Sequence, residues 1–208
     1  MKSILFKTQM VDAILKKGKR QTRRLMTPQP IEHNSVIKMP LPLDKYAKEL
    51  KKLSKKGYKN LVTAGIYQNF LVPQPFAGIG DIVYVKETWQ VTDFLHLEDE
   101  NYGFIYKASI NGQDWQANDE SWKWKPSLFM PEVAARLFLK ITKIRYEPLC
   151  MITESDAILE GVSSVKEYAE LWDSINKDPQ FSFDKNPAVF VYDFDIHEIK
   201  FNDYGIQS

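Results

Sequence analysis

The sequence contains a single cysteine and no histidine arrangement that would bind a metal. Cys150 cannot form an internal disulfide, and a lone cysteine is usual in a reducing compartment. His33, His96 and His197 are too far apart for the closely spaced ligand pairs of structural zinc sites. We therefore expect neither a metal nor a cofactor.

Long apolar runs and glycine-rich phosphate-binding motifs are also missing. The longest apolar stretches, such as VAARLFL, are too short to span a bilayer, and MKSILFKTQM lacks the features of a secretory signal. No Walker loop, Gly-x-Gly-x-x-Gly or Gly-x-Ser-x-Gly motif occurs. These absences predict a cytoplasmic protein without a membrane partner. They argue against most nucleotide-hydrolysing, dinucleotide-binding and serine-hydrolase functions.

Net charge is almost absent, but positive charge is concentrated in one segment. The 208 residues include 28 Lys+Arg and 27 Asp+Glu, yet six of the nine residues in KKGKRQTRR (16–24) are basic. Any contact with nucleic acid must therefore come from local patches and not from the overall field.

Apolar residues recur with helical spacing in two segments of the first quarter. Residues 8–17 predict a helix that Thr8 caps and Gly18 ends, so the basic segment follows a helix C-terminus. Residues 44–56 predict an amphipathic, lysine-rich helix whose lysines form a solvated face or, alternatively, an RNA-facing surface. The residues expected to point inward are Tyr46, Leu50 and Leu53.

Capping motifs mark two further helices. Thr153 and Asp156 fit a capping box before a short helix that Gly161 ends. Ser164 and Glu167 fit a second box before KEYAELWDSINK. The residues that share an apolar face of this helix are Tyr168, Leu171, Trp172 and Ile175.

Apolar runs and alternation predict the strands. IVYVKETW, after a Gly80–Asp81 turn, is typical of a buried strand, and GFIYKA of a short one. RLFLKITKIRYEPL alternates as a half-buried strand, with Leu137, Leu139 and Ile141 on one side. FDKNPAVFVYDFDIHEI contains the last strand. Its inward residues are expected to be Phe190, Tyr192, Phe194 and Ile196.

The order of these elements favours an α+β fold. No repeated βαβ unit is present, which argues against a doubly wound parallel sheet, and a small, mostly antiparallel barrel fits better. Three tryptophans, Trp115, Trp122 and Trp124, are expected to pack over the core in preference to stacking bases. Residues 201–208 are predicted to be a frayed tail.

Four sequence blocks in a fixed order resemble the ASCH family. They are ILKKGKRQTRR, GIGDIVYVKETW, ITESDAILEGV with LWDSIN after it, and NPAVFVYDFDI. The block KWKPSLFMPEVAARLFLKIT is similar to the longer members that are common in phage and prophage genomes. The resemblance implies a PUA-like, mostly antiparallel β pseudo-barrel with flanking helices. It implies one domain over residues 1–200, with insertions at about 34–75 and 93–130 and a tail at 201–208.

Small members of this family include an amidohydrolase that deacetylates N-acetylcytidine with a Lys, a Thr and a Glu. The resemblance implies that Lys19 and Thr22, which form a Lys-x-x-Thr motif, and Glu160 would be the corresponding catalytic residues. Arg24 matches a basic residue of the family shortly after the Thr. The present chain is much longer than these enzymes, so the substrate does not follow from the three matches.

The chemistry of such a site depends on the protonation of the lysine. A threonine hydroxyl becomes a good nucleophile when a base removes its proton, and a lysine amine is a base only when neutral. Neighbouring cations favour the neutral amine, and Glu160 opposes it unless it orients Lys19 or handles the proton of the leaving amine. The cations nearby in sequence are Arg20, Arg23 and Arg24. In the alternative reading, Lys19 and Arg24 form ordinary surface ion pairs and Thr22 merely favours a strand.

Three residues outside the basic segment are also expected to bind a ligand. Glu87 and Trp89 follow the strand VYVK, and a Trp beside a basic cleft can stack a base while Arg or Lys contacts phosphate or carbonyl oxygens. In the alternative interpretation, Trp89 packs against the end of the barrel. Either Tyr192 or its neighbour Asp193, on the last strand, would face the same cavity, and Tyr192 is counted among the binding residues.

The leading hypothesis is an ASCH-like domain that binds RNA or a modified nucleoside in a basic cleft. Its enzymatic form would be an amidohydrolase acting on an acylated cytidine-like base. One alternative is a non-catalytic, phage-type accessory protein that binds a protein partner through its lysine-rich and Trp-rich segments. The other is a ribonuclease. The oligomeric state is left open.

Overall fold

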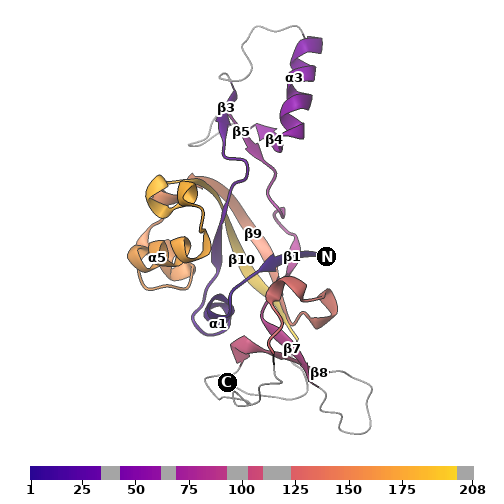
Figure 1. Ribbon diagram of the computed structural model, residues 1–208, viewed down its shortest axis with the longest axis vertical. Coiled ribbons are helices and arrows are strands. Elements are labelled where there is room, and N and C mark those ends of the chain that lie inside the picture. The colour runs from indigo at the N-terminus through magenta and orange to yellow at the C-terminus, as the bar shows by residue number, and fades with distance from the viewer. Residues whose placement is uncertain (34–42, 62–68, 93–102, 110–122, 201–208) are drawn as a thin grey trace. The chain divides into compact units, whose positions relative to one another are not determined.

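The chain folds into two compact units, each assembled from segments far apart in the sequence (Figure 1). The computed structural model describes residues 1–33, 43–61, 69–92, 103–109 and 123–200. Unit 1 contains Met1–Arg20, Ile79–Thr142 and Phe194–Ser208. Unit 2 contains Gln21–Gly78 and Lys143–Asp193.

The described part of unit 1 combines an α-helix with parts of two sheets. Its elements are β1 (Lys2–Leu5), α1 (Thr8–Lys16), β6 (Ile82–Lys86), β7 (Trp89–Thr92), β8 (Gly103–Tyr106), the first part of β9 (Leu137–Pro148) and the end of β10 (Ala188–Ile199). β1 runs parallel to β6, which pairs antiparallel with β9, and β7 pairs antiparallel with β8. Short 3₁₀ helices lie at Lys107–Ser109, Ser127–Phe129 and Glu132–Ala134.

The first helix ends where the sequence predicts but begins differently. Gly18 has a φ of 71°, a left-handed conformation that glycine adopts without a Cβ clash, and this ends α1. The prediction that Thr8 caps the helix is wrong, because Thr8 is its first residue and Lys7 occupies the N-cap position. Val11 and Ile14 are buried, as the spacing predicts. The basic segment therefore leaves α1 through a sharp turn.

The apolar run after the Gly80–Asp81 turn forms two strands instead of one. β6 ends at Lys86 and β7 begins at Trp89. Between them, the backbone N–H of Glu87 is directed at Met130 Sδ, 3.2 Å away. The strand at GFIYKA and the buried alternating residues of β9 are confirmed by β8 and by Leu137, Leu139 and Ile141.

The described part of unit 2 combines α-helices with two groups of strands. Its elements are β2 (Gln21–Leu25), β3 (Ile31–Glu32), α3 (Leu43–Lys55), β4 (Tyr58–Leu61), β5 (Phe70–Pro73), α4 (Glu154–Leu159) and α5 (Val165–Ile175), with the end of β9 and the first part of β10. Short 3₁₀ helices lie at Leu149–Met151, Pro179–Phe181 and Phe183–Lys185. β10 pairs antiparallel with β2, and β5 pairs antiparallel with β3 and with β4. β9 and β10 pass through both units in a sheet of order β1-β6-β9-β10-β2.

The later helices begin at the predicted caps. Thr153 and Asp156 form a complete capping box at α4, and Gly161 follows the helix with a φ of 89°. At α5, the Ser164 side chain accepts from the Glu167 N–H, while the Glu167 carboxylate accepts from the Ser163 N–H (2.8 Å). This corrects the second predicted box, of which the Ser164 half is present.

Helices α4 and α5 share a hydrophobic core with the adjoining strands. Its buried members are Leu149, Ile152, Ala157, Tyr168, Trp172, Val189 and Val191. The predicted inward positions Tyr168 and Trp172 are confirmed, Leu171 is half-buried, and Ile175 is exposed because it lies in the last turn. On β10, Phe190, Tyr192 and Phe194 are buried as predicted, whereas Ile196 is half-buried.

The lysine-rich helix is confirmed as α3, which packs on the small sheet β3-β5-β4. Leu53 and Leu71 are buried together there, with Leu50 partly buried against them. The side chain of Tyr46 lies outside the described residues, as do Trp115, Trp122 and the tail 201–208. Trp124 is half-buried.

The described elements confirm an α+β fold with mostly antiparallel pairing. The pseudo-barrel and the single domain over residues 1–200 stay predictions. None of the helices that the structure describes has the length and apolar character needed to cross a bilayer.

Candidate functional site

The basic segment after α1 is folded inward. Four of the eight buried polar or charged side chains in the described part of the chain belong to it: Lys19, Gln21, Thr22 and Arg23. Burial of such groups is unfavourable unless they are paired or hydrogen-bonded, so specific contacts must hold them. Residues 16–20 of the segment, with Lys19 and Arg20, belong to unit 1, whereas residues 21–24 belong to unit 2.

In unit 1, Lys19 and Arg20 are fixed against the end of α1. Lys19 is 0% exposed, and its Nζ lies 5.8 Å from the centre of the Phe6 ring, within the range of a cation–π contact. The Arg20 Nη1 donates to the carbonyls of Ile14 (3.3 Å) and Lys19 (2.8 Å). Full burial of Lys19 excludes the alternative in which it forms an ordinary surface ion pair. Arg20 therefore uses part of its guanidinium to hydrogen-bond carbonyls at the end of α1.

In unit 2, Arg23 is the centre of a buried ion network. Its guanidinium nitrogens lie 2.7 Å from Glu147 Oε1, 3.1 Å from Asp156 Oδ2 and 3.3 Å from Glu160 Oε1. Nη1 also donates to the side-chain oxygen of Gln21. The side chain of Arg23 is inaccessible to solvent, so the carboxylates replace its hydration.

Arg145 extends this network toward the surface. It contacts Glu147 (3.0 Å), Asp156 (2.8 Å) and Asp193 (3.2 Å), and it retains a 26% exposed side chain. Gln21 Nε2 donates to Asp193 (2.8 Å), which links the outer pairs back to β2. Strand pairing brings these groups together, since Gln21 lies opposite Asp193 in the register of β2 and β10.

The network controls the ionisation of Asp156. Burial alone would raise the pKa of this carboxyl, but a hydrogen bond from the Thr153 N–H, the charge of Arg23, a hydrogen bond from Gln21 and the charge of Arg145 together lower the pKa. Asp156 is therefore held as the carboxylate, and the same residue closes the capping box of α4. The charge network and the start of the helix depend on one side chain.

The other positions of β2 lie beside aromatic residues. Thr22 is opposite Tyr192, and Arg24 is opposite Phe190. Directly opposite residues of an antiparallel pair project from the same face of the sheet. The Tyr192 ring packs 4.6 Å from Phe76 and 5.9 Å from Phe190, and its hydroxyl accepts from the Phe76 N–H (3.1 Å).

Tyr146 completes this aromatic surface. Its ring centre lies 5.5 Å from that of Phe190. We call the set Thr22, Arg24, Phe76, Tyr146, Phe190 and Tyr192 the aromatic face of unit 2.

Electrostatic interactions connect Arg24 with two other predicted site residues. Burial lowers the pKa of Arg24, and this is opposed by the nearby Glu160, Tyr168 and Tyr192. Burial also raises the pKa of Tyr192, so its hydroxyl stays protonated at neutral pH and keeps a proton to donate. Arg24 is thus close to both Glu160 and Tyr192.

Glu160 lies at the C-cap of α4, 3% exposed. Besides its contact with Arg23, it faces Tyr168, whose pKa is raised well above its usual value by burial first and then by the charge of Glu160. Two of the predicted residues, Arg23 and Glu160, are therefore in direct contact. Arg24 connects this pair with the aromatic face through electrostatic interactions.

Glu87 and Trp89 lie in unit 1. Glu87 is 1% exposed and accepts two hydrogen bonds from Arg136 (2.9 and 2.8 Å); burial raises its pKa, opposed by Arg136. Trp89 packs in a core cluster, 5.7 Å from Phe104, with Lys125 Nζ 4.9 Å from a ring centre. These positions match a packing role for Trp89, and its stacking on a base stays a prediction.

Sequence reasoning missed Arg145 and Glu147. Arg145 and Glu147 are two apart in β9, so they project from the same face of the sheet, and this alternation was a usable signal. Asp193 was considered only as the alternative to Tyr192 on the last strand. Within the described residues, no group of three or more His, Cys, Asp or Glu side chains is arranged to hold a metal ion.

Comparison with known proteins gives little guidance. No family model matches the chain. No curated protein matches it either. Among solved structures, the chain is similar to the crystal structure of protein EF3133 from Enterococcus faecalis V583, described as family-model DUF984. The TM-score is 0.38 and the identity 11%, over 91% of this chain and 68% of that chain, a likeness too low to carry any conclusion.

Proposed function

We propose that this chain is an ASCH-like domain with a PUA-like pseudo-barrel, and that its aromatic face binds a nucleobase. The ligand would be a modified nucleoside, free or within RNA. In the enzymatic form of the proposal, the protein hydrolyses an amide on an acylated cytidine-like base. The observation that carries the proposal is the register of β2 and β10, with Thr22 beside Tyr192 and Arg24 beside Phe190.

The chemistry of the aromatic face suits a planar, polar ligand. Aromatic side chains stack on bases and contribute about 1–3 kcal/mol per base. The hydroxyls of Thr22 and Tyr192 can hydrogen-bond to base edges, and the planar guanidinium of Arg24 suits carbonyl or phosphate oxygens. Thr22, Phe190 and Tyr192 are buried, so a base would reach this cluster from its half-buried members, Arg24, Phe76 and Tyr146.

The proposed hydrolysis assigns three roles. Lys19, as the neutral amine, takes the proton of Thr22 while the hydroxyl oxygen adds to the acyl carbon; the C–N bond then breaks, and the amine of the base leaves with a proton. Water hydrolyses the resulting ester of Thr22. Glu160 orients the lysine or passes the proton to the leaving amine. Desolvation favours a neutral amine, and Lys19 is fully buried, whereas the Phe6 ring 5.8 Å from its Nζ favours the charged form.

Binding is tested with purified protein titrated with cytidine, N-acetylcytidine and single-stranded RNA at low ionic strength, where phosphate contacts are strongest. Thr22→Val keeps the branched shape and removes one hydroxyl, and we expect an affinity loss of about tenfold, the equivalent of one hydrogen bond. Thr142→Val is the matched control, because Thr142 is an exposed strand threonine. Absence of binding to all three ligands would refute the proposal.

Catalysis is tested separately with a panel of acylated nucleosides. We expect turnover that Lys19→Ala abolishes, together with the burst of released base that an ester intermediate on Thr22 produces. Circular dichroism of the variant shows whether its fold is retained. Turnover that survives Lys19→Ala would contradict the mechanism, and binding without turnover would leave a non-catalytic nucleobase-binding domain.

A further inference from the structure

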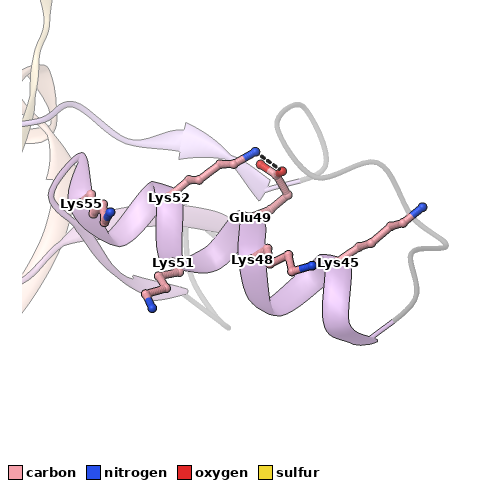
Figure 2. A pocket seen from close by; sticks show the side chains of 6 residues that line it. All are labelled: Lys45, Lys48, Glu49, Lys51, Lys52 and Lys55. Carbon is pink, nitrogen blue, oxygen red and sulfur yellow. Dashed lines mark hydrogen bonds and ion pairs between the residues drawn. The ribbon is translucent and has the colours of Figure 1, made fainter.

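Helix α3 has one apolar face and one lysine face. Leu53 and Leu50 pack toward β5, where Leu71 completes the small core. The lysines project from the helix in several directions (Figure 2), and a hollow of about 380 Å³ lies among them. The residues that line it are Lys45, Lys48, Glu49, Lys51, Lys52 and Lys55. We call the five lysines of this set the lysine face.

The region around α3 is strongly positive, although the chain as a whole is almost neutral. Residues 43–59 contain seven lysines but only two carboxylates, Asp44 and Glu49, in a protein with a net charge of +1. Glu49 pairs with Lys52 (2.7 Å), and Figure 2 shows this ion pair along the helix surface. A strongly positive surface is therefore concentrated on one helix.

Helix stability does not account for these lysines. Lys52 and Lys55 lie in the last turn, where positive charge is favoured by the helix dipole. Lys45 lies near the beginning, where the same dipole opposes it. Lys48 and Lys52, like Lys51 and Lys55, are four residues apart, and like charges at this spacing repel each other. A polyanion placed along the face would relieve this repulsion.

Two other anionic partners suit the lysine face less well. A helix that binds a membrane surface inserts its apolar face, but Leu50 and Leu53 already pack on the sheet. Protein interfaces are enriched in aromatic residues and arginine and depleted in lysine, the opposite of this face. Lysines acting as point charges suit phosphates, which carry no sequence information.

We infer that the lysine face of α3 binds the phosphodiester backbone of single-stranded RNA, independently of sequence. This extends the proposed function from a base to a polymer and rests on it only in the choice of RNA. The helix of 13 residues is about 20 Å long, enough to follow several consecutive phosphates. Four contacts would give a slope of about −3 for the logarithm of affinity against the logarithm of salt concentration.

The test compares two triple variants of the full chain with equal changes in charge. K48Q/K51Q/K55Q neutralises the lysine face and keeps the Glu49–Lys52 pair, and glutamine has nearly the same helix propensity as lysine. The control, K166Q/K177Q/K185Q, removes three exposed lysines from elsewhere in unit 2. Each protein is titrated with a mixed-sequence single-stranded RNA from about 20 to about 200 mM salt. Circular dichroism checks the helix content.

We expect the α3 variant to lose about 100-fold in RNA affinity at 0.1 M salt and about two units of the salt slope, while the control stays within a few-fold of the native chain. Equal losses in both variants would show a general charge effect and overturn the inference. Binding to anionic vesicles as tight as to RNA, and lost in the same variant, would also overturn it.

Titration with N-acetylcytidine separates this inference from the proposed function. A nucleoside has no backbone for α3 to contact, so its binding should be the same in both triple variants. RNA binding that depends on α3 without nucleoside binding would support the lysine face and count against the aromatic face.

Discussion

Replacement of Arg23 by methionine tests whether the buried ion network stabilises unit 2. Methionine retains much of the side-chain length but leaves the carboxylates of Glu147, Asp156 and Glu160 without the guanidinium that lies 2.7–3.3 Å from them. Removing one partner of a buried ion pair typically costs about 3–5 kcal/mol. Because Arg145 still contacts two of the carboxylates, we expect the lower end, about 3 kcal/mol.

Equilibrium unfolding in urea at pH 7 measures this loss. For a slope of about 2 kcal/mol per molar, the midpoint should fall by about 1.5 M. Arg145→Met is the matched control, since this arginine has a 26% exposed side chain and contacts the same acidic groups. Its partly exposed pairs should contribute less, about 1 kcal/mol. Equal losses for the two variants would refute the argument from burial.

The pH dependence separates loss of charge from loss of packing. The pKa of Asp156 is lowered in the folded state, so its stabilising contribution is complete above about pH 4 and is lost as the pH falls through the folded pKa. In Arg23→Met the unpaired carboxylates are relieved by protonation. The difference in free energy of unfolding from the native chain should therefore shrink as the pH falls from 7 toward 4. A difference that is constant over this range would indicate a packing effect alone.

Two local features give further predictions for thermal unfolding. Thr153→Ala removes the side-chain half of the capping box with Asp156 and should cost about 1 kcal/mol, while Thr153→Ser keeps the hydroxyl and should be nearly neutral; equal effects would contradict the capping role. Gly18→Ala, at a φ of 71° with nothing within 4 Å of the added Cβ, should cost only the backbone strain of about 1–2 kcal/mol. Gly57→Ala should cost more, because its φ is 97° and the new Cβ would lie 2.9 Å from Pro28 Cδ; a smaller loss than at Gly18 would contradict the clash.

Local sequence signals predicted the local structure well. The capping box of Thr153 and Asp156, the stop at Gly18 and the alternation along β9 all arise from residues within a few positions of each other. The break between β6 and β7 was missed, because no Gly or Pro marks it. The break lies at Glu87, whose carboxylate accepts a hydrogen bond from Arg136, 49 residues further along the chain. A contact over this distance leaves no local pattern in the sequence.

The buried network could not be predicted for the same reason. Arg23 meets Glu147 across 124 residues and Glu160 across 137 residues, and only the pairing register of the strands brings them together. The sequence analysis named Glu160 through the family resemblance and Arg23 through the charge of the basic segment. It did not indicate that they bind each other. Lys19 was named through the resemblance. Its full burial could not be predicted, because a lysine in a basic segment has the hydropathy of an exposed residue.

The alternation of β2 separates the ion network from the aromatic face within five residues. Gln21 and Arg23 project toward the ion network, whereas Thr22 and Arg24 occupy the alternate positions beside Tyr192 and Phe190. The buried charges hold the strand in register, and the register in turn determines which side chains the aromatic face presents. A slip of one residue would exchange the two sets. Thr22→Val should therefore change nucleobase affinity with little change in stability, and Arg23→Met should first change stability.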